Sequence, residues 1–315
     1  MRLAYDAVLV TGGAGFIGSH TVDLLLENEV HVWVLDDLST GKLRNLNRWK
    51  NDRRLHFKPG TITNYRTVSS LAERVDSIIH LAAVVSPAVS LLRPELTNHV
   101  NGSGTLNVLR AGLKHKVKRL VFASSSSLYG NATNIPIPET APLEPITPYG
   151  VSKLAGEQYC MAFHRSFGLD TVSLRYFNVY GQRQSSNPYS GVIAIFTRQL
   201  LRGRRPTIYG DGNQTRDFIH VSDVARANML ALEPKRLAGE ALNIGTGKAT
   251  TINELLRTLA DAVGKPDTAP NFAELRRGDI RQSCADTSKA RAALGFEPRV
   301  ALRDGLGLLL ACQKR

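Results

Sequence analysis

Short apolar stretches alternate with longer amphipathic stretches along the first half of the chain. The apolar stretches are rich in β-branched residues, and the longer ones repeat apolar positions with a helical period. We expect strands at 7–10, 31–36, 54–60, 77–83, 119–125 and 170–177, and helices at 19–29, 97–115 and 149–168. Strands that alternate with helices of this length predict βαβ units and a parallel, doubly wound α/β sheet. Ligands of such sheets bind at the carboxyl ends of the strands.

The pattern changes after Tyr176, where longer loops rich in Gly, Pro, Asn and Asp appear. Further helices are expected at 191–203, 222–233, 251–264 and 288–295. We therefore predict a Rossmann domain over residues 1–175 and a smaller α/β substrate lobe over 176–315. The chain is expected to return to the main sheet around residues 215–248, so that the two parts interleave.

A glycine-rich turn follows the first predicted strand and opens the first helix. Gly12, Gly15 and Gly18 have the spacing that allows a tight turn, close approach of the backbone to a pyrophosphate, and close packing of helix on strand. Asp36 ends the next strand, where its carboxylate can bind adenosine ribose hydroxyls and repel the 2′-phosphate of NADP. The sequence therefore predicts NAD as the cofactor. Asp37 is a second candidate for the ribose, although a plain loop carboxylate is the simpler interpretation.

Tyr149 and Lys153 are four residues apart in the predicted helix at 149–168, which places both side chains on one face. A tyrosine with a pKa near 10 is a poor base, but a neighbouring ammonium group favours the phenolate. The pair could therefore take the proton of an alcohol while a hydride leaves the same carbon. A surface pair is the alternative, and the glycine turn favours the catalytic interpretation.

Four serines, Ser124 to Ser127, end the strand at 119–125. No GxSxG elbow surrounds them, so they do not indicate a serine hydrolase. Because they lie at the carboxyl end of a strand, hydrogen bonding to a substrate hydroxyl is the role that we expect of one of them.

The formal net charge of +13 raises the question of nucleic-acid binding. The basic residues are spread along the chain, however, and a positive field could equally attract a diphosphate. We therefore expect no nucleic-acid partner. The three cysteines form no CxxC pair, which indicates neither a disulfide framework nor a zinc site. With no apolar run long enough to span a membrane, we expect a soluble, cytoplasmic protein without a bound metal.

Several segments resemble the extended short-chain dehydrogenase/reductase family, and specifically its nucleotide-sugar epimerases and dehydratases. These segments are TGGAGFIG, HLAA, SSSSLYG, YGVSK, LRYFNVYG, YGDGNQTRDFIHVSDVA, NIGTG and GDIRQSCADTSKA. The likeness covers nearly the whole chain. It implies NAD-dependent chemistry on a nucleotide diphosphate sugar, with UDP as the expected nucleotide. It also implies a homodimer that pairs through helices at 98–115 and 149–167.

The resemblance assigns further roles residue by residue. Ser125 matches the catalytic serine or threonine that acts with Tyr149 and Lys153. The expected cofactor-binding residues beyond the glycine turn and the two aspartates are Phe16, Ile17, Thr61, Ile62, Leu81, Ala82, Ala83, Asn101, Tyr149, Lys153 and Tyr176. The expected substrate-binding residues are Ser125, Ser126, Asn178, Val192, Tyr209, Arg216, Arg281 and Ser283. Thr61 departs from the family pattern, which has an aspartate there, so NAD is expected to bind less tightly.

The choice of reaction depends on residues that this chain lacks. Dehydratases and decarboxylases of the family carry a carboxylate where this chain has Ser126 and Ser127, so the resemblance implies 4-epimerisation through a transient 4-keto sugar. Asn178 stands where UDP-glucuronate epimerases tend to have Thr, which favours a neutral hexose. Ser283 is small and leaves room for an N-acetyl group. UDP-glucose, UDP-N-acetylglucosamine and UDP-glucuronate all remain open as substrates.

A protein of another class could be built on the same fold, because a fold does not fix a function. A non-catalytic NAD-binding or RNA-binding protein is that alternative. Such proteins tend to lose the tyrosine or the lysine, and this chain keeps both Tyr149 and Lys153.

Overall fold

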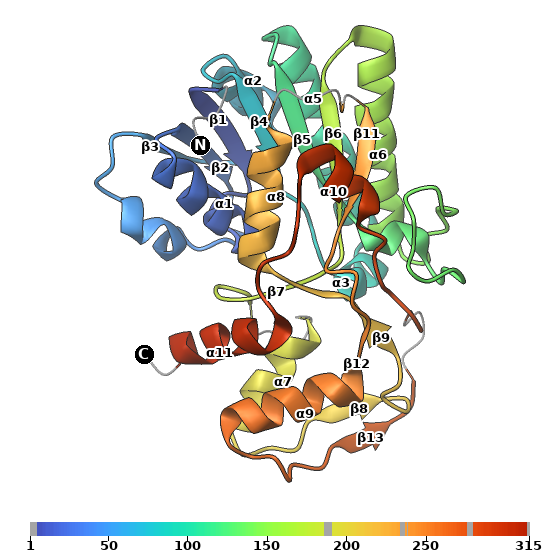
Figure 1. Ribbon diagram of the computed structural model, residues 1–315. Coiled ribbons are helices and arrows are strands. Elements are labelled where there is room, and N and C mark those ends of the chain that lie inside the picture. The colour runs from blue at the N-terminus through green and yellow to red at the C-terminus, as the bar shows by residue number, and fades with distance from the viewer. Residues whose placement is uncertain (1–4, 186–190, 234–236, 238, 276–279, 314–315) are drawn as a thin grey trace.

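A seven-stranded parallel sheet forms the centre of the larger of two lobes in the computed structural model, which describes residues 5–185, 191–233, 237, 239–275 and 280–313 (Figure 1). The strand order is β11-β6-β5-β4-β1-β2-β3. The strands are β1 (Ala7–Thr11), β2 (His31–Asp36), β3 (Leu55–Pro59), β4 (Ser77–His80), β5 (Arg119–Ser125), β6 (Thr171–Tyr176) and β11 (Glu240–Ile244). Every neighbouring pair is parallel, so all seven carboxyl ends lie along one edge of the sheet.

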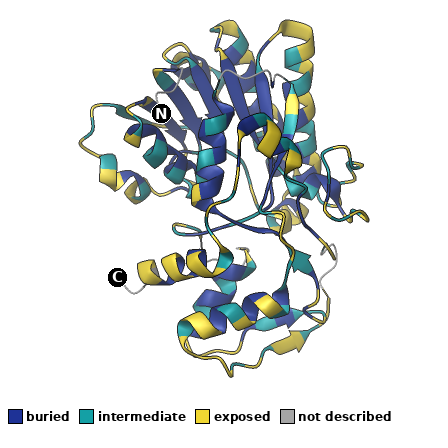
Figure 2. Ribbon diagram, in the orientation of Figure 1, coloured by how far each residue is buried: buried dark blue, intermediate teal, exposed yellow. Residues whose placement is uncertain are grey.

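The strands are apolar on both faces because helices cover both. Along β1, Val8 and Val10 belong to one hydrophobic cluster, whereas Leu9 between them belongs to the other. This alternation follows from the two-residue period of a strand. Figure 2 shows the strands of the sheet as the most continuously buried part of the molecule.

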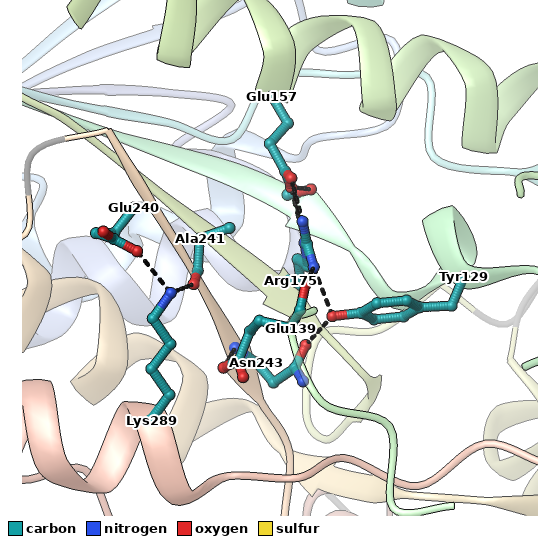
Figure 3. Close-up of polar contacts among 9 residues, drawn as sticks. Tyr129, Glu139, Glu157, Arg175, Glu240, Ala241, Asn243 and Lys289 are labelled. Atoms are coloured by element: carbon teal, nitrogen blue, oxygen red, sulfur yellow. Dashed lines mark hydrogen bonds and ion pairs between the residues drawn. The ribbon is translucent and has the colours of Figure 1, made fainter. Parts of the chain in front are cut away.

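Two layers of helices enclose the sheet. One layer contains α1 (Phe16–Glu27), α8 (Val221–Ala231) and α10 (Ser288–Leu294), whose apolar residues share the cluster of Val8. The other contains α2 (Tyr65–Ala72), α5 (Gly104–Lys114) and α6 (Pro148–Phe167), which contribute to the cluster of Leu9. Figure 3 shows how α10 is fastened to the sheet: Lys289 Nζ donates to Glu240 Oε2 at 2.6 Å and to the Ala241 carbonyl at 3.0 Å.

Shorter elements connect these layers. They are the 3₁₀ turns η1 (Leu43–Trp49) and η3 (Ser126–Tyr129), the helices α3 (Pro87–Leu92) and α4 (Pro94–Asn98), and the π-helical turn η2 (His99–Ser103). The helix expected at 97–115 is therefore interrupted, since α4, η2 and α5 follow one another with a π turn between them.

The smaller lobe has its own hydrophobic cluster around α7 (Val192–Leu201), α9 (Ile252–Val263) and α11 (Leu302–Gln313). Its strands form two-stranded pairs: β7 (Asn178–Tyr180) with β10 (Phe218–His220), β8 (Thr207–Tyr209) with β13 (Asn271–Ala273), and β9 (Thr215–Arg216) with β12 (Thr250–Thr251). In the part of the chain that the structure describes, no helix is both long and apolar enough to cross a bilayer.

The expected α/β class and doubly wound parallel sheet are confirmed. β11 pairs with β6, so the chain does return to the sheet after Tyr176. α10 also packs on this sheet, although residues 176–315 were expected to form the substrate lobe. Parts of the longer loops expected after Tyr176, at 186–190 and 276–279, lie outside the described residues.

Candidate active site

The glycine turn lies between β1 and α1 and has the shape that its sequence predicts. Gly12 adopts φ +72°, and a Cβ there would lie 2.8 Å from the Ala82 amide nitrogen. A Cβ on Gly18 would collide with the Gly12 carbonyl oxygen, so only glycine allows helix and turn to pack this closely. Gly15 caps α1 without a side-chain hydrogen bond, and the first turn carries no acidic residue. No acidic side chain of α1 itself therefore competes for the amides of its first turn, which suits a bound pyrophosphate.

Asp36 ends β2 beside this turn. Its carboxylate accepts hydrogen bonds from the Ala14 amide at 3.0 Å and from the Leu38 amide at 2.9 Å. Burial raises the pKa of Asp36, whereas these backbone hydrogen bonds lower it. Asp37 is exposed and accepts a hydrogen bond from the Ser39 amide instead. The buried aspartate is thus the one built into the phosphate turn.

The other cofactor candidates follow the carboxyl ends of neighbouring strands, so the parallel sheet brings them to one edge. Thr61 and Ile62 follow β3, residues 81–83 follow β4, and Tyr176 ends β6. The Tyr176 hydroxyl donates to Asn228 Oδ1 of α8 at 2.5 Å, so its polar end is engaged on the sheet's helix layer. Together the glycine turn, Asp36 and this row of positions fit a dinucleotide such as NAD.

The π turn η2 presents Asn101 to the loop after β4. Its Oδ1 accepts from the Val84 amide at 2.8 Å, and its Nδ2 donates to the Val84 carbonyl at 3.0 Å and to Ser152 Oγ at 2.9 Å. Ser152 precedes Lys153 in α6, so Asn101 ties the loop after β4 to the helix that carries the acid–base pair. A π turn at this place matches the tendency of such turns to occur at functional sites.

Tyr149, Lys153 and Ser125 come together where α6 crosses the carboxyl end of β5. Tyr149 and Ser125 share a side-chain hydrogen bond. Lys153 Nζ is buried and donates to the Ala123 carbonyl at 2.8 Å. Thr147 caps α6 by accepting from the Gly150 amide at 3.2 Å, which fixes where the first turn places Tyr149. The three residues chosen from sequence therefore form one cluster.

The electrostatics of the cluster differ from the expectation that Lys153 lowers the pKa of Tyr149. Burial raises the pKa of Tyr149, and the hydrogen bond with Ser125 only partly opposes this. Burial also lowers the pKa of Lys153 to about 8. Both shifts arise because burial shields the two side chains from water and so disfavours their charged forms. The protein alone thus keeps Tyr149 protonated at neutral pH, and an additional positive charge is needed to favour the phenolate.

His80, at the end of β4, is buried beneath this cluster. Burial, and then the charge of Lys153, lowers the pKa of His80 to about 3, so the ring is neutral. Its nitrogens bond with Thr11 Oγ1 at 2.7 Å and with Thr105 Oγ1 at 3.0 Å. His80 therefore supports the strand ends and does not serve as a base.

The substrate candidates lie on the smaller lobe and on the segments that join it to the sheet. The Thr215 amide donates to the Arg281 carbonyl at 3.0 Å, which brings Arg281 beside Arg216. Arg281 makes a bidentate ion pair with Asp211 at 2.8 and 2.9 Å, and this pair lowers the pKa of the Asp211 carboxyl. The two arginines thus lie on neighbouring segments of the lobe, where a diphosphate could bind.

The remaining candidates occupy defined positions in the same region. Asn178 begins β7, Val192 begins α7, Tyr209 ends β8, Ser126 begins η3, and Ser283 is buried in the segment before α10. No contact in the structure assigns a ligand to them, so their substrate-binding roles stay predictions. Among the described residues, no group of three His, Cys, Asp or Glu side chains could hold a metal ion.

Sequence reasoning missed two sets of buried polar residues next to the site. The Asp217 carboxylate accepts hydrogen bonds from the amides of Thr246, Gly247 and Ala285, which holds the segment of Ser283 against β10. Glu157 and Arg175 form a buried ion pair behind the serines of β5. In the sequence, such residues can be recognised as charged residues inside an otherwise apolar strand or helix face. A charge that is buried there needs a partner.

Comparison with known proteins agrees with this geometry. Residues 8–245 match the NAD dependent epimerase/dehydratase family. A UDP-glucose 4-epimerase of Mycolicibacterium smegmatis is 40% identical over 300 residues, which cover 95% of each chain.

Solved structures are similar over the whole length. A UDP-glucose 4-epimerase of Thermotoga maritima with UDP-glucose has a TM-score of 0.92 and 42% identity, and covers 98% of each chain. A UDP-N-acetylglucosamine 4-epimerase of Methanobrevibacter ruminantium M1, in complex with UDP-N-acetylmuramic acid, has a TM-score of 0.94 and 36% identity, and covers 100% of each chain. The glycine turn, the Tyr149–Lys153–Ser125 cluster and these similarities lead to one conclusion: the chain belongs to the NAD dependent epimerase/dehydratase family.

Proposed function

We propose that this protein is an NAD-dependent 4-epimerase of a UDP-hexose or UDP-N-acetylhexosamine. The observation that carries the proposal is the cluster of Tyr149, Lys153 and Ser125 at the same sheet edge as the dinucleotide turn. The named relatives act on UDP-glucose and UDP-N-acetylglucosamine, which supports this substrate class.

The residues of the cluster divide the proton chemistry between them. Tyr149 accepts the proton of the sugar C4 hydroxyl as the C4–H bond breaks, and Ser125 holds both oxygens by hydrogen bonds. Lys153 supplies a buried positive charge within the same helix turn. When bound, NAD⁺ would supply the hydride acceptor and a further positive charge near Tyr149, and the glycine turn and Asp36 would hold it. Once the 4-keto sugar has turned in the site, Tyr149 returns the proton to the C4 oxygen, so that C4 can be reduced on its opposite face.

The absence of a carboxylate at Ser126 and Ser127 favours epimerisation over elimination. Both serines are half-buried at the start of η3, immediately after Ser125. A hydroxyl with a normal pKa cannot take the proton at the neighbouring carbon that loss of water would require. UDP-glucuronate remains the second candidate substrate, since the same C4 chemistry applies to it.

The decisive experiment incubates the purified protein with UDP-glucose, UDP-N-acetylglucosamine and UDP-glucuronate separately and resolves the products by chromatography. We expect one sugar to give its C4 epimer with only catalytic NAD, because the hydride returns to the molecule that lost it. NADH absorbance should stay low at steady state. Stoichiometric NADH would instead identify a net dehydrogenase, and loss of water from the product would identify a dehydratase.

Substitution of Ser283 tests the preference for an N-acetyl group. Ser283 is buried, and a closely packed site cannot accept extra atoms without strain. We expect the wild type to turn over UDP-N-acetylglucosamine at least as well as UDP-glucose. Ser283→Tyr should then lower kcat/KM for the acetamido sugar by about 10-fold relative to UDP-glucose. Equal losses on both sugars would mean general damage to the lobe, and no loss would place Ser283 outside the sugar pocket.

We also propose a homodimer in which α6 contributes to the interface. Val151, Tyr159 and Phe167 are exposed apolar or aromatic residues on this helix, and Leu91 and Leu92 of α3 are exposed as well. Apolar side chains that gather on an outer face often mark a protein interface.

The formal net charge of +13 supports attraction of the nucleotide diphosphate and needs no nucleic-acid partner.

A further inference from the structure

A buried ion pair lies directly behind the candidate acid–base cluster. Arg175 of β6 donates to Glu157 of α6 through Nη2 at 2.5 Å and through Nε at 3.1 and 3.2 Å (Figure 3). The Glu157 and Arg175 side chains are 1% and 5% exposed. Although burial opposes the charge, the contacts with Glu157 raise the pKa of Arg175. The Arg175 guanidinium therefore stays charged inside the protein.

This pair continues the contacts that fasten α6 to the end of β5. Lys153 binds the Ala123 carbonyl, Glu157 Oε2 accepts from Ser124 Oγ at 2.6 Å, and Tyr149 bonds with Ser125. Three successive residues of β5 are thus held by three residues of one helix. Of these three contacts, the one between Glu157 and Ser124 is the one that includes neither Tyr149 nor Lys153.

On its other side Arg175 reaches the segments that border the smaller lobe. Its Nη1 donates to Tyr129 Oη at 2.7 Å and to the Glu139 carbonyl at 3.0 Å. Tyr129 Oη in turn donates to Asn243 Oδ1 at 2.6 Å, as Figure 3 shows. The hydrogen-bonded chain therefore crosses from α6 to β11.

Asn243 extends the chain to the segment that carries Ser283. Its Nδ2 donates to the Ile137 carbonyl at 2.8 Å and to the Asp286 carbonyl at 3.2 Å. The Ile137 amide donates to the Cys284 carbonyl at 2.8 Å, next to Ser283. One continuous network thus joins the helix of the acid–base pair to the loop proposed to line the sugar pocket.

Stability alone does not explain such a network. A buried ion pair loses so much hydration that well-packed apolar residues often stabilise a fold equally well or better. Directional hydrogen bonds, in contrast, fix the positions of the groups that they join. Beyond each other, the two ion-pair residues bond to three residues, Ser124 of β5, Tyr129 of η3 and Glu139 of the following loop, so the geometry of the pair constrains these segments together with α6 and β6.

We infer that Glu157 and Arg175 are positioning residues, which hold the serine end of β5 in register with Tyr149 and Lys153 and couple that register to the Ser283 segment. Glu157 acts through Ser124, whose backbone continues into Ser125. Arg175 acts through Tyr129 and Asn243. The inference deepens the proposed function and rests on it.

Ser124→Ala is the mildest test, because it removes the hydroxyl that links Glu157 to β5 and leaves the ion pair intact. Small displacements of reacting groups reduce turnover strongly, so we expect kcat to fall by about 10-fold. KM for the UDP-sugar and the affinity for NAD should change by less than about 2-fold, since no ligand contact is removed. Ser77→Ala is the matched control: Ser77 is buried at the far end of β4, and its Oγ has no partner among the described residues.

A second test separates positioning from stability. Glu157→Met leaves Arg175 unpaired and should lower both the thermal unfolding temperature and kcat. The double variant Glu157→Met with Arg175→Met removes both charges, so the unfolding temperature should recover. We expect kcat to stay low in the double variant, because Ser124 still lacks Glu157 and Tyr129 now lacks Arg175 as well. Recovery of kcat together with the unfolding temperature would overturn the inference.

The outcomes also distinguish the inference from the proposed function. If the wild type epimerises no UDP-sugar, the proposed function fails and the inference fails with it. If the wild type is active and Ser124→Ala retains its full kcat, only the inference fails. An equal loss of kcat in Ser77→Ala would likewise reject it, since that change touches no part of the network.

Discussion

Replacement of Tyr149 by phenylalanine should reduce kcat by at least about 100-fold, the usual scale for loss of a general acid–base group. The ring and its packing remain, and the amide of residue 149 can still donate to Ser90 Oγ. We therefore expect an unchanged unfolding temperature and unchanged NAD binding, measured by thermal denaturation and fluorescence titration. The loss should appear in kcat and kcat/KM alike, because the group acts on the transition state.

Tyr159→Phe provides the matched control, since Tyr159 lies on the same helix but is exposed. Its turnover should equal that of the wild type. Near-normal activity of Tyr149→Phe would remove Tyr149 from the proton transfer. Ser125 and Lys153 would then be the groups to examine.

Substitution of Asp217 should have the largest effect on stability. The side chain is completely buried and receives hydrogen bonds from three amides and from Thr246 Oγ1 at 2.5 Å. Asp217→Ala leaves these donors without an acceptor, so we expect the free energy of unfolding to fall by about 3 kcal/mol. Urea denaturation monitored by circular dichroism measures this change.

The same substitution should also weaken substrate binding. Asp217 holds Ala285, and Ser283 lies two residues before it. We therefore expect KM for the UDP-sugar to rise in the folded fraction, while NAD affinity stays unchanged. Asp267→Ala, which alters an exposed carboxylate in a turn, should leave the free energy of unfolding and the KM as they are. An unfolding free energy equal to that of the wild type would show that the amides find other acceptors.

The sheet could be predicted well because its strands are continuous buried runs bounded by polar residues. β2 and β5 cover the residues expected from sequence, and the later helices begin and end within a few residues of expectation. The glycine turn and the Tyr149–Lys153 pair were also visible, since each depends on spacing within a single segment.

Features that depend on contacts between distant segments could not be read from spacing. The π turn at η2 interrupts a helical pattern that looks continuous in the sequence, and Asn101 within this turn pairs with Val84 of a distant segment. The pKa of Tyr149 is raised because the folded chain buries its side chain, and Lys153 binds the strand carbonyl of Ala123. The partner of Arg175 likewise lies on another element, so sequence reveals the buried charge but not the network.

The position of β11 at the end of the sheet order has a consequence for any fragment of this protein. β6 is completely buried and bonds on one side to β5 and on the other to β11, which is supplied from beyond the smaller lobe. A chain that stopped after Tyr176 would therefore end in a bare, apolar edge strand with a row of unpaired amides and carbonyls. Such edges recruit other strands and promote aggregation. The dinucleotide-binding half, although nearly contiguous in sequence, depends on the later chain for its solubility.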